Sequence, residues 1–370
     1  MSPAQYGFRS GLSTENAINN FLDFVYRALD NGEFTICILI DLSKAFDTLN
    51  RDILLKKLEY YGVRNVAYSW FASYLSNRSQ CTKINDSLSS MLPINCDVAQ
   101  GSILAPLLFI IYMNDIIKAS SLLHFILYAD DTSVFSSSND INTLVNTLNV
   151  ELTNICTWLE ANHLSLNSDK TSYLIFHRRK PVAQDIASIC INGNAIRRAD
   201  DAKFLGVMVD EKLSFRSHAA YIVTKLSKYS YVLYKVRHFI PVNELVQIYY
   251  KLIYPHLIYC ITVWGGSYAS ILKPVMVLQN RILRAICNAG FRASVDPIYQ
   301  RLKLLKLEEI YRYMAGAYVF KTLNSDRPCV FQYRDQTNYV TRGSVLDLLK
   351  VPMVTSVQTS HSIRVSGPKI

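Results

Sequence analysis

The sequence lacks the patterns that mark several common protein classes. None of its eight cysteines forms a Cys-x-x-Cys pair, and no cysteine–histidine set has zinc-site spacing. The longest apolar stretches, residues 103–113 and 252–264, are too short or too interrupted to span a bilayer. There is no signal-peptide pattern at Met1, no tandem repeat and no low-complexity linker. We therefore expect an intracellular chain with buried thiols, no targeting signal and no membrane contact.

The composition predicts a folded, basic protein. With 370 residues and 50% apolar content, the chain can form two or three subdomains with a real core. A formal charge of +10 fits a polyanionic partner, although it also fits a merely basic soluble protein. The 24 tyrosines, interleaved with Lys and Arg, suit stacking on bases or sugars; most are equally expected in the core or on the surface.

The most informative stretch is Tyr-Ala-Asp-Asp at residues 128–131. It lies between two apolar runs of strand length, residues 122–127 and 132–135, and this predicts a hairpin with two acids at its turn. Turn chemistry alone can explain such a pair, but the apolar flanks predict that Asp130 and Asp131 are buried and poorly solvated. A cation would relieve their repulsion. Hard oxygen ligands favour Mg²⁺, which completes its shell with substrate phosphates, so a nucleotide substrate is implied.

A third acid follows another strand. Residues 34–40 form an unbroken strand candidate, mostly apolar, that ends at Asp41. Asp41 beside the acid pair would give a three-carboxylate cluster from two separate strands. Such a cluster can hold two metal ions for in-line phosphoryl or nucleotidyl displacement. We predict Asp41 and Asp130 as the main ligands, with Asp131 and the carbonyl oxygen of Leu42 assisting.

Periodicity and turn residues predict most of the remaining elements. Apolar residues at helical spacing predict a first helix that begins after Ser13 or Thr14. The same spacing predicts a helix that is kinked near Pro255, over residues 243–259, and a helical segment from 296 to 323. Further helices are expected over residues 103–117, 140–162, 215–239 and 273–286. Two more helices are expected within residues 50–76, divided by Tyr61-Gly62. Hairpins are expected at residues 79–95, with a turn at residues 85–87, and at residues 189–196, around Asn192-Gly193-Asn194.

Six ordered blocks then give a resemblance to a known family. Together they resemble the reverse transcriptase of non-LTR (LINE-type, jockey-like) retrotransposons, over essentially the whole chain and most weakly after about Phe291. The blocks are residues 5–14 (QYGFRSGLST), 41–47 (DLSKAFD), 99–106 (AQGSILAP), 128–131 (YADD), 167–171 (NSDKT) and 204–207 (FLGV).

The resemblance implies a fold and a domain order. It implies an α/β fold (α+β type), a right-hand polymerase palm with partial fingers and a helical thumb. The expected parts are partial fingers at 1–33, a palm at 34–212 with a finger-side insertion at about 50–98, a thumb at 213–290 and a shortened post-thumb region at 291–370. It also implies N-terminal truncation, either as a genomic copy or as a fragment of a longer polyprotein that carries an upstream endonuclease.

The resemblance also assigns nucleotide-binding residues. Phe46 would pack under the incoming sugar and reject a 2′-hydroxyl; its alternative is a core phenylalanine. Gln100 and Gly101 would line the nucleotide and template pocket. A glycine before a helix also lets the backbone approach a ligand, while the structural alternative is a helix start capped by Ser102; both can hold at once.

Further roles are implied for residues outside that pocket. Lys170 would donate a proton to the pyrophosphate leaving group, or it is simply solvated. Arg9 would approach template or phosphate, or it braces its own loop. Phe204, Leu205 and Gly206 would belong to a primer grip, a hairpin that positions the primer terminus; the alternative is an ordinary bulge.

The implied function is RNA-directed DNA synthesis. The expected partners are an RNA template, a DNA primer and deoxynucleoside triphosphates, with two Mg²⁺ ions (Mn²⁺ as the alternative), no obligate protein partner and a nuclear and cytoplasmic ribonucleoprotein location. The competing hypothesis is a catalytically inactive, truncated nucleic-acid-binding relic. A metal-dependent hydrolase is disfavoured because no His or Lys base adjoins the acids in sequence, and it leaves the Gln-Gly-Ser and Phe-Leu-Gly blocks unexplained.

Overall fold

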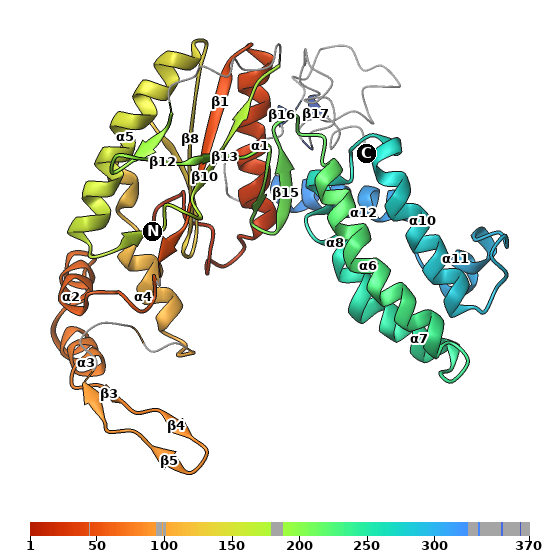
Figure 1. The fold of residues 1–370 in the computed structure, drawn as a ribbon, viewed down its shortest axis with the longest axis horizontal. Helices are drawn as coiled ribbons and strands as arrows, with labels where there is room; N and C mark the ends of the chain where they lie inside the picture. The colour runs from red at the N-terminus through yellow and green to blue at the C-terminus, as the bar shows by residue number, and fades with distance from the viewer. Residues whose placement is uncertain are drawn as a thin grey trace. The chain divides into compact units, whose positions relative to one another are not determined.

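The computed structural model describes residues 1–43, 45–93, 98, 101–178, 188–324, 332–333, 349–350 and 363. Two compact units make up the chain (Figure 1). The first comprises Met1–Ala17, Phe34–Ile175 and Lys180–Ala199. The second comprises Ile18–Glu33, Phe176–Arg179 and Asp200–Ile370.

A five-stranded mixed sheet forms the centre of the first unit. β1 and β8 pair antiparallel along their lengths, with Ile38 opposite Val134, and β8 turns back into β7. Ile36, Ile38 and Val134 are fully buried, as expected for β-branched residues in central strands. In spatial order the strands are β13 (Arg197–Arg198), β10 (Ser172–Phe176), β1 (Phe34–Ile40), β8 (Asp131–Ser138) and β7 (His124–Tyr128).

Helices of the first unit complete its core. α5 (Ile141–Ala161) packs on β8 through its apolar stripe, and the Asp140 side chain caps it by accepting a hydrogen bond from the Thr143 amide at 2.8 Å. Leu148 of α5 and Phe109 of α4 belong to the same buried cluster as the sheet residues. The other helices are α2 (Arg51–Tyr60), α3 (Asn65–Leu75), α4 (Ala105–Tyr112) and the 3₁₀ helix η1 (Ile116–Ala119).

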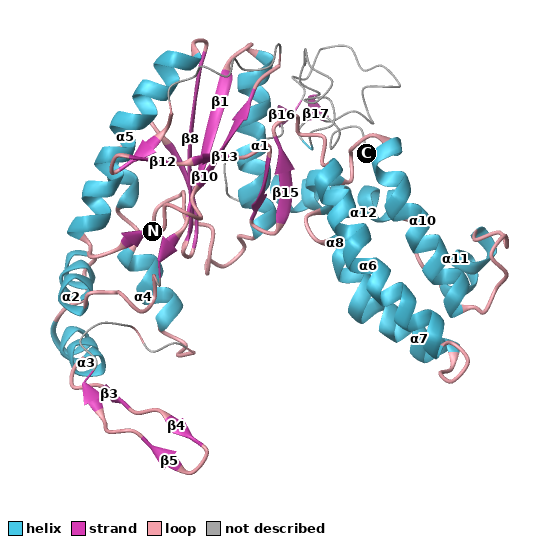
Figure 2. Ribbon diagram, viewed as in Figure 1, coloured by secondary structure: helices cyan, strands magenta, loops and turns pink. Residues whose placement is uncertain are grey.

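Short antiparallel ladders extend from this core (Figure 2). The predicted hairpin at 79–95 forms with its turn at residues 85–86, and the predicted hairpin at 189–196 forms with its turn at 192–193. The pairs are β3 (Ser79–Gln80) with β6 (Leu92–Pro93), β4 (Lys83–Ile84) with β5 (Ser87–Leu88), β11 (Cys190–Ile191) with β12 (Asn194–Ala195), and β2 (Leu42–Ser43) with β9 (Ser165–Leu166).

The second unit consists of one hairpin and a set of helices. Phe21 of α1 (Thr14–Asp30) packs edge-on against Phe204 at 5.1 Å and Phe176 at 5.8 Å between ring centroids. The hairpin is β14 (Asp201–Phe204) with β15 (Val207–Asp210). The helices are α6 (Arg216–Val236), α7 (Val242–Ile248), the π-helix η2 (Tyr249–Ile253), α8 (Tyr254–Ile258), α9 (Ile261–Trp264), α10 (Ala269–Ile286), α11 (Asp296–Leu302) and α12 (Leu307–Leu323); a further pair joins β16 (Gln332–Tyr333) and β17 (Leu349–Lys350).

The predicted α/β fold class is confirmed, while some helix bounds and some thiols differ from expectation. The helix expected over 103–117 ends at Tyr112, and a separate 3₁₀ turn follows it. Cys37, Cys156 and Cys260 are buried as expected, whereas Cys81 is exposed and Cys190 and Cys287 are half-buried. Burial raises the pKa of the Cys37 thiol. Among the helices described, none is long and apolar enough to cross a membrane.

Candidate active site

The acid pair lies at the turn between β7 and β8, as the sequence predicts. Tyr128 pairs with Asp131, so Ala129 and Asp130 form a two-residue turn. Ala129 has φ of 56°, in the left-handed region that alanine rarely adopts. Asp130 and Asp131 are both exposed, so the expectation of a buried, poorly solvated pair is wrong. The apolar flanks are buried, but the turn itself projects beyond the core and reaches solvent.

Asp41 reaches the same edge of the sheet. Ile40 is opposite Thr132 in the β1–β8 ladder, and Asp41 and Asp131 are the next residues along the two antiparallel strands. The Asp41 side chain is 42% exposed. Register therefore brings the acids of two separate strands to one solvent-facing edge, as the order of the sequence blocks implies.

A loop from far along the chain holds the backbone of Asp41. Its amide donates to the Thr171 hydroxyl at 3.3 Å, and its carbonyl accepts from the Asn167 amide at 2.9 Å. The Thr171 hydroxyl also donates to the Asn167 carbonyl at 2.8 Å, and Thr171 is fully buried. Sequence reasoning gave neither residue a role. The only signal was their place in a recurring block, which does not show what they touch.

Lys170 belongs to this loop and points toward the acid. Its Nζ lies 3.9 Å from Asp41 Oδ2, and the Lys170 side chain is 70% exposed. A contact this long between exposed groups contributes little to stability. The geometry nevertheless places the Lys170 ammonium beside the acid edge.

The residues predicted to line a nucleotide pocket differ from one another in their exposure to solvent. Phe46 is half-buried and stacks on Phe109, with ring centroids 4.2 Å apart. Gly101 is exposed with φ of +82°, and Gln100 lies outside the described residues. The Ser102 hydroxyl accepts from the Ala105 amide at 3.0 Å, but the N-cap residue of α4 is Leu104, so the prediction that Ser102 caps this helix is wrong.

Arg9 braces its own loop, which is one of its two predicted roles. Its Nη1 donates to the carbonyl oxygens of Ser2 at 2.7 Å and Gln5 at 3.0 Å. The guanidinium thus ties together the segment that precedes the first helix.

The hairpin predicted as a primer grip forms within the second unit. Leu205 and Gly206 make its turn, with φ of 44° and +88°. The Tyr259 hydroxyl donates to the Leu205 carbonyl at 2.7 Å. A Cβ added at Gly206 would lie 2.9 Å from the Tyr259 ring. Glycine is therefore required here both by backbone conformation and by the close approach of the ring.

A buried histidine supports this hairpin. His218 of α6 is 2% exposed, and its Nδ1 accepts from the Met208 amide of β15 at 3.3 Å. The imidazole packs edge-on against Trp264, with centroids 5.3 Å apart. Burial lowers the pKa of His218 to about 4, so the ring is neutral at physiological pH.

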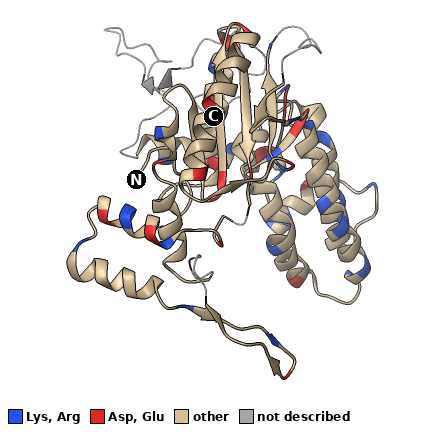
Figure 3. Ribbon diagram, turned by 60° about the vertical axis from the view of Figure 1, so that its left-hand side comes forward, with Lys and Arg blue, Asp and Glu red and all other residues tan. Residues whose placement is uncertain are grey.

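Basic and aromatic residues also accumulate on the second unit. Figure 3 shows Lys and Arg distributed along its long helices. Three tyrosine rings of α6 each have a cation over them. Lys225 lies over Tyr221, Lys235 over Tyr231, and Arg237, which directly follows the helix, over Tyr234. Such pairs hold cations at a fixed place on the surface, which suits contact with a polyanion.

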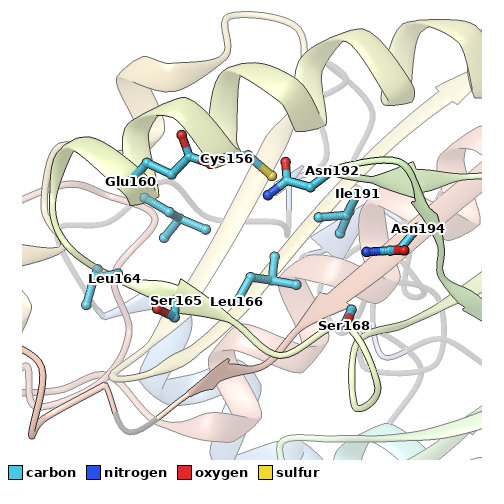
Figure 4. A pocket seen from close by; sticks show the side chains of 10 residues that line it. Cys156, Glu160, Leu164, Ser165, Leu166, Ser168, Ile191, Asn192 and Asn194 are labelled. Carbon is cyan, nitrogen blue, oxygen red and sulfur yellow. The ribbon is translucent and has the colours of Figure 1, made fainter.

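A pocket borders the loop that holds Asp41. It has a volume of about 270 Å³ and is formed by the end of α5, by β9 and by the β11–β12 hairpin (Figure 4). Ser168 of the loop lines it, but none of the three acids does. Its lining residues are Cys156, Leu159, Glu160, Leu164, Ser165, Leu166, Ser168, Ile191, Asn192 and Asn194.

The acids fit a metal by their chemistry and their shared edge. In the described part of the chain, no three His, Cys, Asp or Glu side chains gather closely enough to form a metal site. The residues at the edge are nevertheless carboxylates with access to solvent, and backbone register places Asp41 beside Asp131. Hard carboxylate oxygens of this kind are suitable ligands for Mg²⁺, which retains waters and takes further ligands from substrate phosphates.

Comparison with known proteins adds a family match. The family model described as reverse transcriptase (RNA-dependent DNA polymerase) matches residues 1–209. The RNA-directed DNA polymerase from mobile element jockey of Drosophila melanogaster is 27% identical over 326 residues, which cover 85% of this chain and 35% of that protein. The probable RNA-directed DNA polymerase from transposon BS of the same species is 27% identical over 323 residues, which cover 82% of this chain and 34% of that protein.

This chain is much shorter than the relatives that it matches. This chain spans about a third of the length of the curated relatives it matches. Among solved structures, telomerase from Candida albicans in complex with the TWJ fragment of telomeric RNA aligns with a TM-score of 0.41 and 14% identity. That alignment covers 82% of this chain and 55% of the telomerase chain.

Proposed function

Because the chain belongs to the reverse transcriptase (RNA-dependent DNA polymerase) family, we propose that it extends a DNA primer with deoxynucleotides on an RNA template. The observation that carries this proposal is the convergence of Asp41 with the Asp130–Asp131 turn at one edge of the sheet. In this proposal the sheet of the first unit is the palm, and the helices of the second unit form the thumb.

The acids would hold two divalent ions, with Asp41 and Asp130 as the main ligands and Asp131 and the Leu42 carbonyl assisting. Bound there, the ions would lower the pKa of the primer 3′-hydroxyl and stabilise charge on the triphosphate. The protein's own contribution is positional. The Asn167 and Thr171 contacts fix the Asp41 backbone, and Lys170, whose Nζ lies 3.9 Å from Asp41 Oδ2, would deliver a proton to the departing pyrophosphate.

Two further residues would bind substrates. The Phe46 ring, set by its stack on Phe109, would lie under the sugar and disfavour a 2′-hydroxyl. Gln100 and Gly101 would line the nucleotide pocket, and the hairpin at 204–207 would position the primer.

The second candidate is a catalytically inactive nucleic-acid binder. The basic, tyrosine-rich surface of α6 favours it, because that surface needs no metal to bind a polyanion. The chain also spans only about a third of the length of these relatives.

Primer extension separates the two candidates. The assay uses oligo(dT) annealed to poly(rA), deoxythymidine triphosphate and Mg²⁺, with wild type, Asp130→Asn and the control Asp86→Asn, an exposed acid in the β4–β5 turn. The polymerase proposal expects incorporation by wild type and Asp86→Asn and a loss of at least about 10³-fold in Asp130→Asn, since an essential metal ligand is removed. Salt-dependent duplex binding without incorporation by any of the three selects the inactive binder.

A further inference from the structure

The N-terminal segment forms an additional edge on the catalytic hairpin. Residues 4–6 run parallel to β7: the Tyr6 amide donates to the Leu127 carbonyl at 2.8 Å, and the Leu127 amide donates to the Ala4 carbonyl at 2.9 Å. β7 is the last strand of the sheet, so this segment covers its otherwise open edge. Leu127 is two residues before Ala129, and the segment therefore ends beside the acid turn.

The side chain between those two bonds reaches the turn itself. Gln5 is completely buried, and its Oε1 accepts from the Gly7 amide at 2.8 Å and from the Ala129 amide at 3.3 Å. Two backbone donors on one oxygen fix which end of the amide faces the turn. Gln5 Nε2 is buried without a hydrogen-bond partner in the described structure. A buried unpaired donor is unfavourable, so the favourable hydrogen bonds of this side chain are those of its oxygen.

The turn is strained and needs such support. Ala129 has a left-handed backbone at φ 56°, which costs energy for any residue with a Cβ. Ala129 is only 6% exposed, so without the Gln5 oxygen its amide would be a buried donor with no acceptor. The Gln5 oxygen therefore satisfies the amide of the residue that immediately precedes Asp130.

Gly7 closes the other side of the contact. A Cβ added to Gly7 would lie 2.5 Å from the Ala129 nitrogen and 3.0 Å from the Tyr128 carbonyl carbon, both backbone atoms that cannot rotate away. Arg9 fixes the backbone of the segment by donating a hydrogen bond to the Gln5 carbonyl at 3.0 Å. The acid turn is thus gripped by a hydrogen bond and by direct contact.

We propose that Gln5, with Gly7, is a positioning residue that sets the backbone of the Asp130–Asp131 turn relative to Asp41. This inference rests on the proposed polymerase function for its catalytic consequence, but not for its geometry. A turn freed from the Gln5 oxygen relaxes toward unstrained backbone angles and carries both carboxylates with it. Misplacement of catalytic groups by about 1 Å is enough to lower a rate by about 100-fold.

Hydrogen exchange tests the geometry without any requirement for activity. The amide of Ala129 is followed by mass spectrometry with single-residue fragmentation in wild type, Gln5→Leu, Gln5→Glu and the control Gln300→Leu, an exposed glutamine of α11. Gln5→Leu removes the acceptor, and loss of one such bond accelerates exchange by about three- to ten-fold. Gln5→Glu keeps an acceptor oxygen, and a carboxyl group buried this completely stays protonated and uncharged, so exchange at Ala129 stays close to that of wild type.

Polymerisation kinetics test the catalytic consequence. Gln5→Leu is expected to lower kcat by about 100-fold and to raise the Mg²⁺ concentration needed for half-maximal rate, with KM for the nucleotide and affinity for primer–template changed less than about three-fold. Gln5→Glu recovers most of kcat. A general loss of folding would instead reduce primer–template binding together with the rate.

Gly7→Ala provides a second test in case Gln5→Leu does not fold. It keeps the Gln5 oxygen but pushes on the turn, so we expect the same loss of kcat; Gly290→Ala, where an added Cβ meets open space, is the matched control. Unchanged exchange at Ala129 in Gln5→Leu, or a Gly7→Ala enzyme with wild-type kcat, overturns the proposal. If wild type incorporates no nucleotide, the proposed function fails, and the exchange result still decides whether Gln5 holds the turn.

Discussion

Gly206 in the β14–β15 turn offers the sharpest test of the packing described for the second unit. Its φ of +88° lies in the region that favours glycine, and a Cβ there would lie 2.9 Å from Cε1 and from the hydroxyl oxygen of Tyr259. That hydroxyl donates to the neighbouring Leu205 carbonyl at 2.7 Å. Gly206→Ala therefore adds backbone strain and displaces the ring that anchors the turn.

The expected cost has two parts. A left-handed alanine costs about 1–2 kcal/mol. Displacement of Tyr259 removes a hydrogen bond that contributes about 1 kcal/mol. We expect Gly206→Ala to lower the free energy of opening of the hairpin by about 2–3 kcal/mol. Tyr259→Phe, which removes only the hydrogen bond, should lower it by about 1 kcal/mol.

Native-state hydrogen exchange at increasing urea concentrations measures this free energy for peptides that cover residues 201–210. The matched control is Gly290→Ala, which meets no atom within 4 Å and should stay within about 0.5 kcal/mol of wild type. The reasoning is refuted if Gly206→Ala is as stable as Gly290→Ala, because neither the strain nor the contact with Tyr259 would then exist in solution.

Three further predictions concern single residues. The folded-state pKa of His218, about 4, lies below its ordinary value of 6.5, so the stability that the neutral ring contributes is lost as pH falls from 6.5 toward 4. Between pH 7 and pH 5 this loss amounts to about 2 kcal/mol, and it should be absent in His218→Gln, measured by exchange of the β15 amides at pH 7, 6 and 5. Lys170→Met should leave the melting temperature within about 2 °C of wild type, because the pair with Asp41 is long and exposed, yet lower kcat for primer extension; wild-type kcat would contradict the proton-donor role. Phe46→Val should increase ribonucleotide incorporation relative to deoxynucleotide incorporation, and an unchanged ratio would leave Phe46 as a packing residue only.

Local patterns were sufficient for much of the fold. The apolar run ending at Asp41 and the two runs around the acid pair predicted β1, β7 and β8, because strands of this kind are specified by short stretches of sequence. The Tyr61-Gly62 pair correctly divided two helices, and Asn192-Gly193 correctly placed a hairpin turn.

Other features depend on contacts that a local pattern does not contain. The Gln5 oxygen and the Ala129 amide are 124 positions apart, and Asp41 and Thr171 are 130 apart. The exposure of Asp130 and Asp131 depends on where the sheet ends, which the apolar flanks do not reveal. The break after Tyr112 falls at the polar pair Asn114-Asp115, which a helical pattern read across residues 103–117 treats as an exposed face of one helix.

The sequence predicted a kink near Pro255, and the structure has an irregularity at this place, but it is a π-helix and not a simple kink. Proline has no amide hydrogen and clashes with the carbonyl four residues earlier, so a disturbance upstream of Pro255 was expected. The structure accommodates it as the π-helix of residues 249–253, in which the Tyr254 amide donates to the Tyr249 carbonyl five residues back. Sequence alone does not distinguish this solution from a simple bend.

The central claim is that the edge formed by Asp41 and the Asp130–Asp131 turn binds the divalent ions used for nucleotidyl transfer. Iron-mediated cleavage measures this directly: Fe²⁺ replaces Mg²⁺ in the presence of primer–template and nucleotide, ascorbate generates radicals at the metal, and mass spectrometry locates the cut peptide bonds. We predict cuts next to residues 41 and 128–131 that disappear with excess Mg²⁺ and in Asp41→Asn and Asp130→Asn, but persist in Asp86→Asn. Cuts only elsewhere, or cuts at this edge that survive both substitutions, would contradict the claim.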